Sequence, residues 1–237
     1  MKENVKKISE FDVLFLRKGD MEKYKEIDLK TWPRAEIFTL YTKQWPGVVH
    51  TGTKRLNVEK TIAYLKKNGL KTVPSLLYIA TECINAQGNY KIAYKDGKLV
   101  EWEEVHPLYP VLNANYNITY HTIDRERSFA AFYKNYLKDM EENKAKTGAF
   151  ATVWPENSFV VTVPHFFEFD SVSMPYRGSN YYFAPIVVLG KYKEEDGHLK
   201  MPVAITGNHA VADAWHTNKF YEDMQNMLDN PETWCII

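Results

Sequence analysis

Several stretches of the chain repeat apolar residues every three or four positions, which is the spacing of a helix with one buried face. The segment RAEIFTLYTKQ, which follows Pro33, places Ile37, Phe38 and Tyr41 on one side and predicts a short amphipathic helix. Further helices are predicted at 58–68, 74–86 and 124–144, and after Asp213. The helical segments are spread along the whole chain.

Strand signals lie between these helices. The segments SFVVTVPHFFEFDSV and YYFAPIVVLGKY are rich in β-branched and aromatic residues, which favour strands. Asp96-Gly97 and Asp196-Gly197 each separate two strand-like runs, and this dipeptide is a strong hairpin signal. The pattern therefore predicts an α/β fold in which a sheet is flanked by helices.

No break in composition divides the chain. It contains no internal repeat, low-complexity linker or stretch rich in Pro, Gly and Ser. A polar run at 17–20 precedes Met21, which could itself be a natural start. We therefore expect residues 1–20 to be an N-terminal extension and residues 21–237 to form a single domain.

Charge and cysteine content exclude several classes of protein. The 30 basic and 30 acidic side chains cancel, so neither nucleic acid nor an anionic membrane is expected as a partner. Cys83 and Cys235 are too few for a disulfide framework and too far apart for a metal cluster. The N-terminus lacks the apolar run of a signal peptide, and no run of about 18 apolar residues could span a bilayer. We expect a cytoplasmic protein.

The best candidate for chemistry is the stretch GNHAVADAWH, which joins a predicted strand to the last helix. Loops of this kind hold functional side chains on a rigid frame. His209 there could act as a base. Taken alone, the stretch favours a buried structural histidine, with Asp213 as a helix cap, over a catalytic base.

A resemblance adds to this reading. NHAVADAWH is similar to the HHxxxDG signature of the chloramphenicol acetyltransferases, whose second histidine is catalytic and falls at His209. TWPRAEIF, KIAYKDGKLVEWEEVHP, FEFDS, YYFAPIVVLGKY and KMPVAI also resemble blocks of this family, in the family's order. The likeness covers most of the chain from Met21 to about Leu228. The histidine motif alone also occurs in the acyltransferase cores of 2-oxo acid dehydrogenase complexes, which normally bring lipoyl domains and long linkers.

The resemblance implies a two-layer α/β sandwich and an O-acetyltransferase that moves acetyl from acetyl-CoA to chloramphenicol, a reaction of antibiotic resistance. His209 would be the general base and would be oriented by a backbone carbonyl. Arg34 and Asp213 would pair and support the site. The oxyanion donor falls at Thr162 when Phe-Asp-Ser anchors the comparison, and at Val161, which cannot donate, when Pro164 anchors it.

The resemblance also implies positions for both substrates. Lys71, Lys191 and Tyr192 would bind CoA. The acceptor would contact Tyr41, Trp45, Leu112, Phe166 and Asn180. The family further implies a homotrimer with active sites between subunits, so that His209 comes from one subunit and Thr162 with Tyr41 from its neighbour.

The chain departs from the family pattern at several positions. Asn208 replaces the first motif histidine, and Ala214 replaces the glycine after the aspartate; Asn180 and Phe166 differ in the acceptor region. A different hydroxylated acceptor is therefore an alternative, and a catalytically silent trimeric binding protein is another. His209 and His216 match no standard zinc spacing, so no metal is expected.

Overall fold

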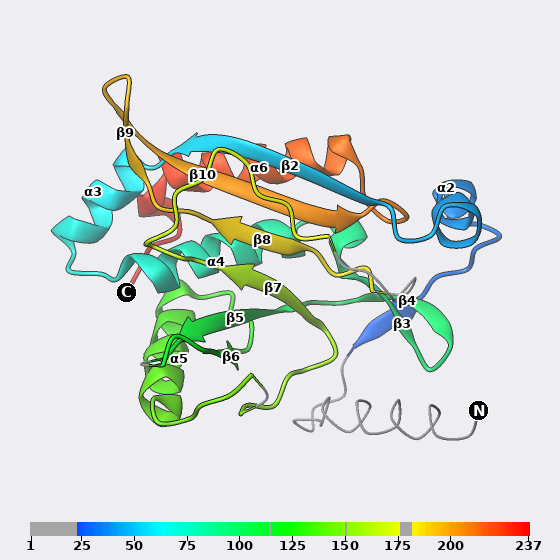
Figure 1. Ribbon diagram of the computed structural model, residues 1–237, viewed down its shortest axis with the longest axis horizontal. Coiled ribbons are helices and arrows are strands. Elements are labelled where there is room, and N and C mark those ends of the chain that lie inside the picture. The colour runs from blue at the N-terminus through cyan, green and yellow to red at the C-terminus, as the bar shows by residue number, and fades with distance from the viewer. Residues whose placement is uncertain (1–22, 114, 150, 176–181) are drawn as a thin grey trace.

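A mixed β-sheet with helices packed on one face forms the centre of the molecule in the computed structural model, which describes residues 23–113, 115–149, 151–175 and 182–237 (Figure 1). The expected extension at residues 1–20 lies outside these described residues. The strand order of the large sheet is β2-β10-β8-β7-β5-β6. These strands are β2 (Val49–Asn57), β10 (His198–Asn208), β8 (Ile186–Leu189), β7 (Ser158–Thr162), β5 (His106–Leu112) and β6 (Ile118–Thr122).

Strand directions in the large sheet decide where functional residues can lie. β5, β7 and β8 run parallel, whereas β10 runs antiparallel to β8 and to β2. The carboxyl ends of β5, β7 and β8 therefore lie at one end of the sheet, and the carboxyl end of β10 lies at the other. Figure 1 shows these two ends on opposite sides of the molecule.

Both predicted hairpins are confirmed. β9 (Lys193–Glu195) pairs with the start of β10 across Asp196-Gly197, and β3 (Ile92–Lys95) pairs with β4 (Lys98–Trp102) across Asp96-Gly97. The four turn residues all have φ between 51° and 77°, which a two-residue hairpin turn with the right twist requires. With β1 (Tyr24–Glu26), β3 and β4 form a second, three-stranded sheet.

Helices cover one face of the large sheet. They are α3 (Glu59–Lys67), α4 (Thr72–Asn85), α5 (Phe129–Asn143) and α6 (Ala214–Asp229), with short turns η3 (Gly88–Lys91) and η4 (Pro231–Thr233). α6 contacts β2, α4 contacts β5, and α5 contacts β6. Fully buried apolar side chains such as Leu77, Phe132, Phe220 and Val203 form the core between the two layers. The predicted two-layer α/β sandwich is confirmed.

The opposite face of the sheet is covered by the chain segment that follows β7. Phe169 packs there against Val188 of β8 and Ala204 of β10 in a small second cluster. This segment was predicted as a continuation of the strand, which is wrong because β7 ends at Thr162. Pro164 has no N–H to continue the hydrogen-bond ladder, so the chain leaves the sheet at that point.

The first predicted helix is also interrupted. α2 (Ala35–Thr39) has a single turn, and a π-helical turn, η2 (Leu40–Gln44), continues it. Trp45 N donates to Leu40 O, the i to i+5 pattern of a π-helix. Such turns shift the following side chains around the helix axis and occur frequently at functional sites. Here the π-turn carries Tyr41.

Candidate active site

The segment 207–216 joins a strand to a helix, as predicted: residues 209–213 form a tight turn between the end of β10 and the start of α6. His209 N donates to Val48 O at 3.0 Å, which extends the pairing of β10 with β2 by one residue. Asn208 is buried, and its side chain accepts a bond from Ala210 N at 2.9 Å and donates to Tyr182 O at 3.1 Å. Asn208, which stands where the HHxxxDG signature has its first histidine, therefore stabilises the turn through neutral hydrogen bonds.

The start of α6 is capped by Asp213. Its Oδ1 accepts a bond from Trp215 N at 3.1 Å and lies 3.0 Å from Nδ1 of His216. The same Nδ1 lies 3.3 Å from Asp213 N. One nitrogen cannot donate and accept at once, so we assign the shorter, charge-assisted bond from His216 to the carboxylate. Ala214 is the first residue of the helix and has no positive φ, so the exchange from glycine strains nothing.

Arg34 binds this turn at three points. Its Nε donates to Ala210 O at 2.9 Å, its Nη2 to His209 O at 3.1 Å, and its Nη1 to Asp213 Oδ2 at 2.8 Å. The predicted pairing of Arg34 with Asp213 is confirmed. Burial raises the pKa of the Asp213 carboxyl, but the hydrogen bonds and charges of Arg34 and His216 outweigh it and hold that pKa well below its ordinary value.

Replacing Arg34 with alanine is expected to lower the thermal unfolding midpoint at pH 7 by roughly 5–10 °C. Losing one partner of this partly screened ion pair, together with two carbonyl contacts, costs about 2–3 kcal/mol. The low pKa of Asp213 means that this stabilisation is complete above its unfolded pKa of about 3.9 and fades as the pH falls below it. Thermal melts at pH 7 and pH 3 should therefore show a smaller difference at pH 3.

The matched control for this prediction is Arg34→Lys, which keeps the charge but cannot reach three acceptors at once. We expect it to lose part of the stability that Arg34→Ala loses. A fully stable Arg34→Ala protein without activity would contradict the structural role of Arg34.

His209 is half-buried and well oriented. Its Nδ1 lies 3.2 Å from Ala212 O, which can only accept, so Nδ1 carries the N–H, and in the neutral ring the lone pair is on Nε2. Orientation by a backbone carbonyl was predicted and is confirmed. The ring of Tyr41 stacks on His209 with centroids 4.3 Å apart and an interplanar angle of 15°. An imidazole in this state can accept a proton at Nε2.

The position of Tyr41 corrects one expectation. Tyr41 was expected to approach His209 from a neighbouring subunit, yet it stacks on His209 within a single chain. The π-turn η2 aims the ring at the motif turn. Trp45, at the end of that turn, is 58% exposed and lies 6.0 Å from the Tyr41 ring. Tyr41, Trp45 and His209 thus belong to one group at the carboxyl end of β10.

Thr162 lies in a second group, at the other end of the sheet. It pairs with Val188, which pairs with Ala204 of β10. His209 follows Ala204 by five residues, and two strand spacings separate β7 from β10, so Thr162 and His209 are on the order of 20 Å apart. Within one chain these two residues cannot act on the same atom.

The two candidates for the oxyanion donor face opposite sides of the sheet. Val161 is fully buried in the main core beneath the helices. Thr162 is half-buried and, with its neighbour Val188, lies on the face away from the helices. Only Thr162 combines a hydroxyl with a position outside the main core.

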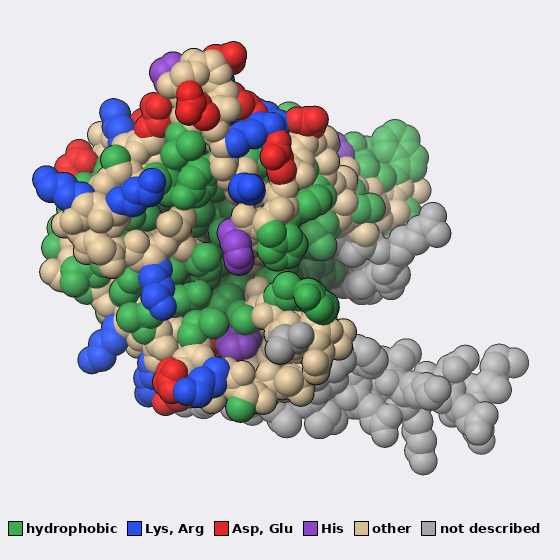
Figure 2. Space-filling model, turned by 60° about the vertical axis from the view of Figure 1, so that its left-hand side comes forward, with side chains coloured by type: hydrophobic (Ala, Val, Ile, Leu, Met, Phe, Trp, Pro, Cys, Tyr) green, Lys and Arg blue, Asp and Glu red, His purple; other side chains and the backbone are tan. Residues whose placement is uncertain are grey.

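Other predicted residues lie near Thr162. Leu112 ends β5 and is 46% exposed, and Phe166 follows β7 and is 64% exposed. Lys191 is exposed just after β8, where its N donates to Phe167 O at 2.9 Å. Tyr192 is half-buried against the main core. Figure 2 shows a hollow on this side of the molecule, lined by hydrophobic side chains, with lysine and arginine side chains around it.

Lys71 is exposed at the N-terminus of α4, where its N donates to the Tyr133 hydroxyl at 3.0 Å. Figure 1 shows the start of α4 at the same end of the molecule as the carboxyl ends of β7 and β8. Asn180 lies outside the described residues.

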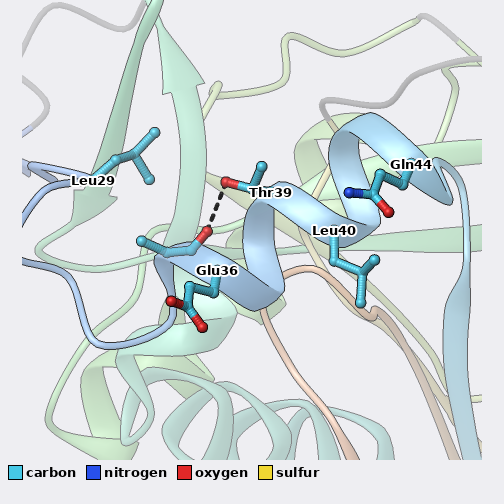
Figure 3. A pocket seen from close by; sticks show the side chains of 6 residues that line it. Leu29, Glu36, Thr39, Leu40 and Gln44 are labelled. Atoms are coloured by element: carbon cyan, nitrogen blue, oxygen red, sulfur yellow. Dashed lines mark hydrogen bonds between the residues drawn. The ribbon is translucent and has the colours of Figure 1, made fainter.

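A depression of about 460 Å³ lies on the outer side of α2. Figure 3 shows its lining side chains, among which Thr39 donates a hydrogen bond to Ala35 O within the helix. The lining residues are Leu29, Ala35, Glu36, Thr39, Leu40 and Gln44. None of them is a predicted site residue, and Glu36 offers the depression its one ionisable side chain. Its lining therefore lacks a base with an orienting partner.

Sequence reasoning missed three residues that contact or approach the motif turn. His50 on β2 places its ring 5.8 Å from the His209 ring, and Asn89 donates to Val211 O at 2.6 Å. Gln87 donates to His216 O at 3.2 Å. All three lie more than a hundred positions away along the chain, and only the strand pairing and the packing of η3 bring them close. No local motif signals them.

Within the described ranges, no group of three or more His, Cys, Asp or Glu side chains is placed to hold a metal ion. In the same part of the chain, no helix combines the length and the apolar character needed to cross a membrane.

Comparison with known proteins gives consistent matches. The family model described as chloramphenicol acetyltransferase matches residues 22–225. A chloramphenicol acetyltransferase of Clostridium perfringens is 30% identical over 223 residues, covering 90% of this chain and 98% of that protein. One from Staphylococcus aureus is 28% identical over 211 residues, covering 88% and 97%.

Solved structures share the fold. A chloramphenicol acetyltransferase superposes with a TM-score of 0.78 at 20% identity, covering 87% of this chain and all of that one. The dihydrolipoamide acetyltransferase of Azotobacter vinelandii superposes with a TM-score of 0.62 at 16% identity, covering 93% and 99%.

Proposed function

The chain belongs to the chloramphenicol acetyltransferase family, and on this premise we propose that it transfers the acetyl group of acetyl-CoA to a hydroxyl of chloramphenicol. The observation that carries the proposal is the hydrogen bond that orients the His209 ring. Its Nδ1–H is bound to Ala212 O, so its Nε2 is free to act as a base. Such a reaction would give resistance to the antibiotic.

The proposed reaction is a direct transfer. Nε2 of His209 takes the proton of the acceptor hydroxyl while the acceptor oxygen attacks the thioester carbonyl carbon. The resulting oxyanion accepts a hydrogen bond from the Thr162 hydroxyl. When the tetrahedral intermediate collapses, the C–S bond breaks, and the CoA thiolate takes the proton from Nε2. His209 is thereby returned to its neutral form, and no acetyl-enzyme forms.

We propose that the site is completed between subunits of a homotrimer. His209 and Tyr41 lie at one end of the sheet and Thr162 at the other, on the order of 20 Å apart in one chain. A cyclic assembly with head-to-tail contacts places one end of each subunit against the other end of its neighbour. In this proposal one subunit supplies His209 with Tyr41, and its neighbour supplies Thr162.

The substrates are assigned to these two groups. Lys71, Lys191 and Tyr192 would bind CoA, because a cation suits its phosphates and an aromatic ring suits its adenine. Trp45 would contact the acceptor beside His209. Leu112 and Phe166 of the neighbouring subunit would line the acceptor pocket, with Asn180 as a further candidate.

A second candidate function is acetylation of a different hydroxylated small molecule. The exposed Phe166 favours this alternative, because it changes the aromatic lining where the family has tryptophan, and such contacts set acceptor discrimination. A catalytically silent binding protein has less support, since the argument for it was Val161 in the donor position, and Val161 lies in the main core.

We also propose a cytoplasmic location. The buried Cys83 and Cys235 form no disulfide, which fits a reducing compartment.

The deciding experiment measures thiol release from acetyl-CoA with and without chloramphenicol. We expect release that depends on chloramphenicol and yields an O-acetylated product in the mass spectrum. A chloramphenicol analogue without the acceptor hydroxyl is the control and should give only background release. If chloramphenicol gives background release while another hydroxylated compound from a panel gives turnover, the second candidate function is correct.

A further inference from the structure

His50 lies beside the proposed general base without a role in the mechanism above. It is on β2, directly opposite Gly207 of β10, so both residues face the same side of the sheet. A Cβ on Gly207 would face Tyr90 and Ala212. His50 is therefore on the side where the motif turn leads into α6, and its ring lies 5.8 Å from that of His209 at an angle of 46°.

The charged groups around His50 come from the motif turn and the elements packed on it. His209 and Asp213 are the groups that act on its charge, and Asp213 is itself bound by Arg34 and His216. Tyr41, from η2, stacks on His209. Burial lowers the pKa of His50, the nearby His209 lowers it further, and Asp213 offsets part of this effect.

We propose that His50 is a second functional imidazole of this site: it titrates together with His209, and the charge at position 50 sets the acidic limit of acetyl transfer. A positive charge on one imidazole lowers the pKa of a second imidazole 5.8 Å away. The decrease is about half a unit in a water-like dielectric and about two units at an effective dielectric constant of 20. The pair therefore binds its second proton at a distinctly lower pH than its first.

This coupling has a consequence for catalysis, and to that extent it rests on the proposed function. When the pair of imidazoles holds one added proton, that proton is on His50 in some molecules and on His209 in the others. The molecules with the proton on His50 stay active, because Nε2 of His209 can still accept a proton. Activity should then fall in two steps as the pH decreases. With a neutral residue at position 50, activity should fall in a single step. With a permanent cation there, that decrease should occur at lower pH, because the cation opposes protonation of His209.

The test compares the pH dependence of kcat/KM for the wild type, His50→Gln and His50→Lys. His50→Gln is the neutral reference, with an acid limb of unit slope. We expect His50→Lys to move that limb down by half a unit to one unit relative to His50→Gln, so that at the acidic end it retains about three- to tenfold more of its plateau activity. Coincident acid limbs for the two variants, or a limb at higher pH for His50→Lys, would overturn the proposal.

A second measurement does not depend on turnover. NMR titration of the imidazole carbons, assigned by single replacements, follows His50 in the wild type and in His209→Gln. Removing the neighbouring imidazole should raise the titration midpoint of His50 by about half a unit to two units. An unchanged midpoint would overturn the coupling even if the enzyme is active. A shifted midpoint in a protein without acetyltransferase activity would contradict only the proposed function.

Discussion

Replacing His209 with alanine is expected to reduce chloramphenicol-dependent thiol release at least about 10³-fold at saturating acetyl-CoA. His209, at the carboxyl end of β10, binds a backbone carbonyl through Nδ1, which leaves Nε2 as the ring nitrogen that can accept a proton. Without it, the acceptor hydroxyl has no base at the point of attack. Tyr41, which stacks on the ring, would lose its partner but cannot replace its chemistry.

The control for this replacement separates chemistry from folding. Arg34, Asp213 and the backbone of the motif turn do not depend on the imidazole for their hydrogen bonds, because they bind through carbonyl and carboxylate oxygens. The thermal midpoint of His209→Ala should therefore stay close to that of the wild type. Turnover at the wild-type rate in the folded variant would reject His209 as the base.

Replacing Thr162 with valine is expected to lower kcat about 10²–10³-fold, the usual effect of losing one oxyanion donor. Valine keeps the branched shape that suits β7, so folding should change little. Thr162→Ser, which restores the hydroxyl, is the matched control and should recover most of the activity. A negligible loss in Thr162→Val would show that this hydroxyl is not the donor.

Mixing the two variants tests where the site is assembled. If His209 and Thr162 act from adjacent subunits, each pure variant has one defect in every site. Co-refolding His209→Ala with Thr162→Val in equal amounts should then produce about a quarter of sites with both residues intact, and about a quarter of wild-type activity. No recovery in mixed trimers, confirmed as mixed by mass spectrometry, would contradict a site that His209 and Thr162 share across a subunit contact.

Local chemistry explains why some of the fold was predictable. The Asp-Gly turns at 96–97 and 196–197 need positive φ, and Asp213 caps a helix through its own carboxylate, so each signal lies within a few residues of the structure that it predicts. The orientation of the His209 ring and the pairing of Arg34 with Asp213 came instead from the family likeness, and the structure agrees with both.

Long-range geometry explains what the sequence did not predict. His50 reaches the site only because β2 pairs with β10 over nine residues, and a pairing partner more than 150 positions away leaves no local pattern. The position of Tyr41 depends on a π-turn, which rotates the following side chains around the helix axis. The spacing of apolar residues in the sequence does not reveal such a rotation. The resemblance to the family did not decide whether Val161 or Thr162 takes the position of the oxyanion donor. In the structure, the alternation of side chains along β7 places the two residues on opposite faces of the sheet.

Because the proposed site is divided between the two ends of the sheet, the acetyltransferase activity of each chain would depend on the concentration of the protein in the cell. A chain could fold by itself, with a complete core, and still hold only half of the reacting groups at either end. Scarce copies would then be silent although intact, and activity would rise more steeply than abundance until most chains had met their neighbours. Protection against an antibiotic would consequently begin at a threshold of expression.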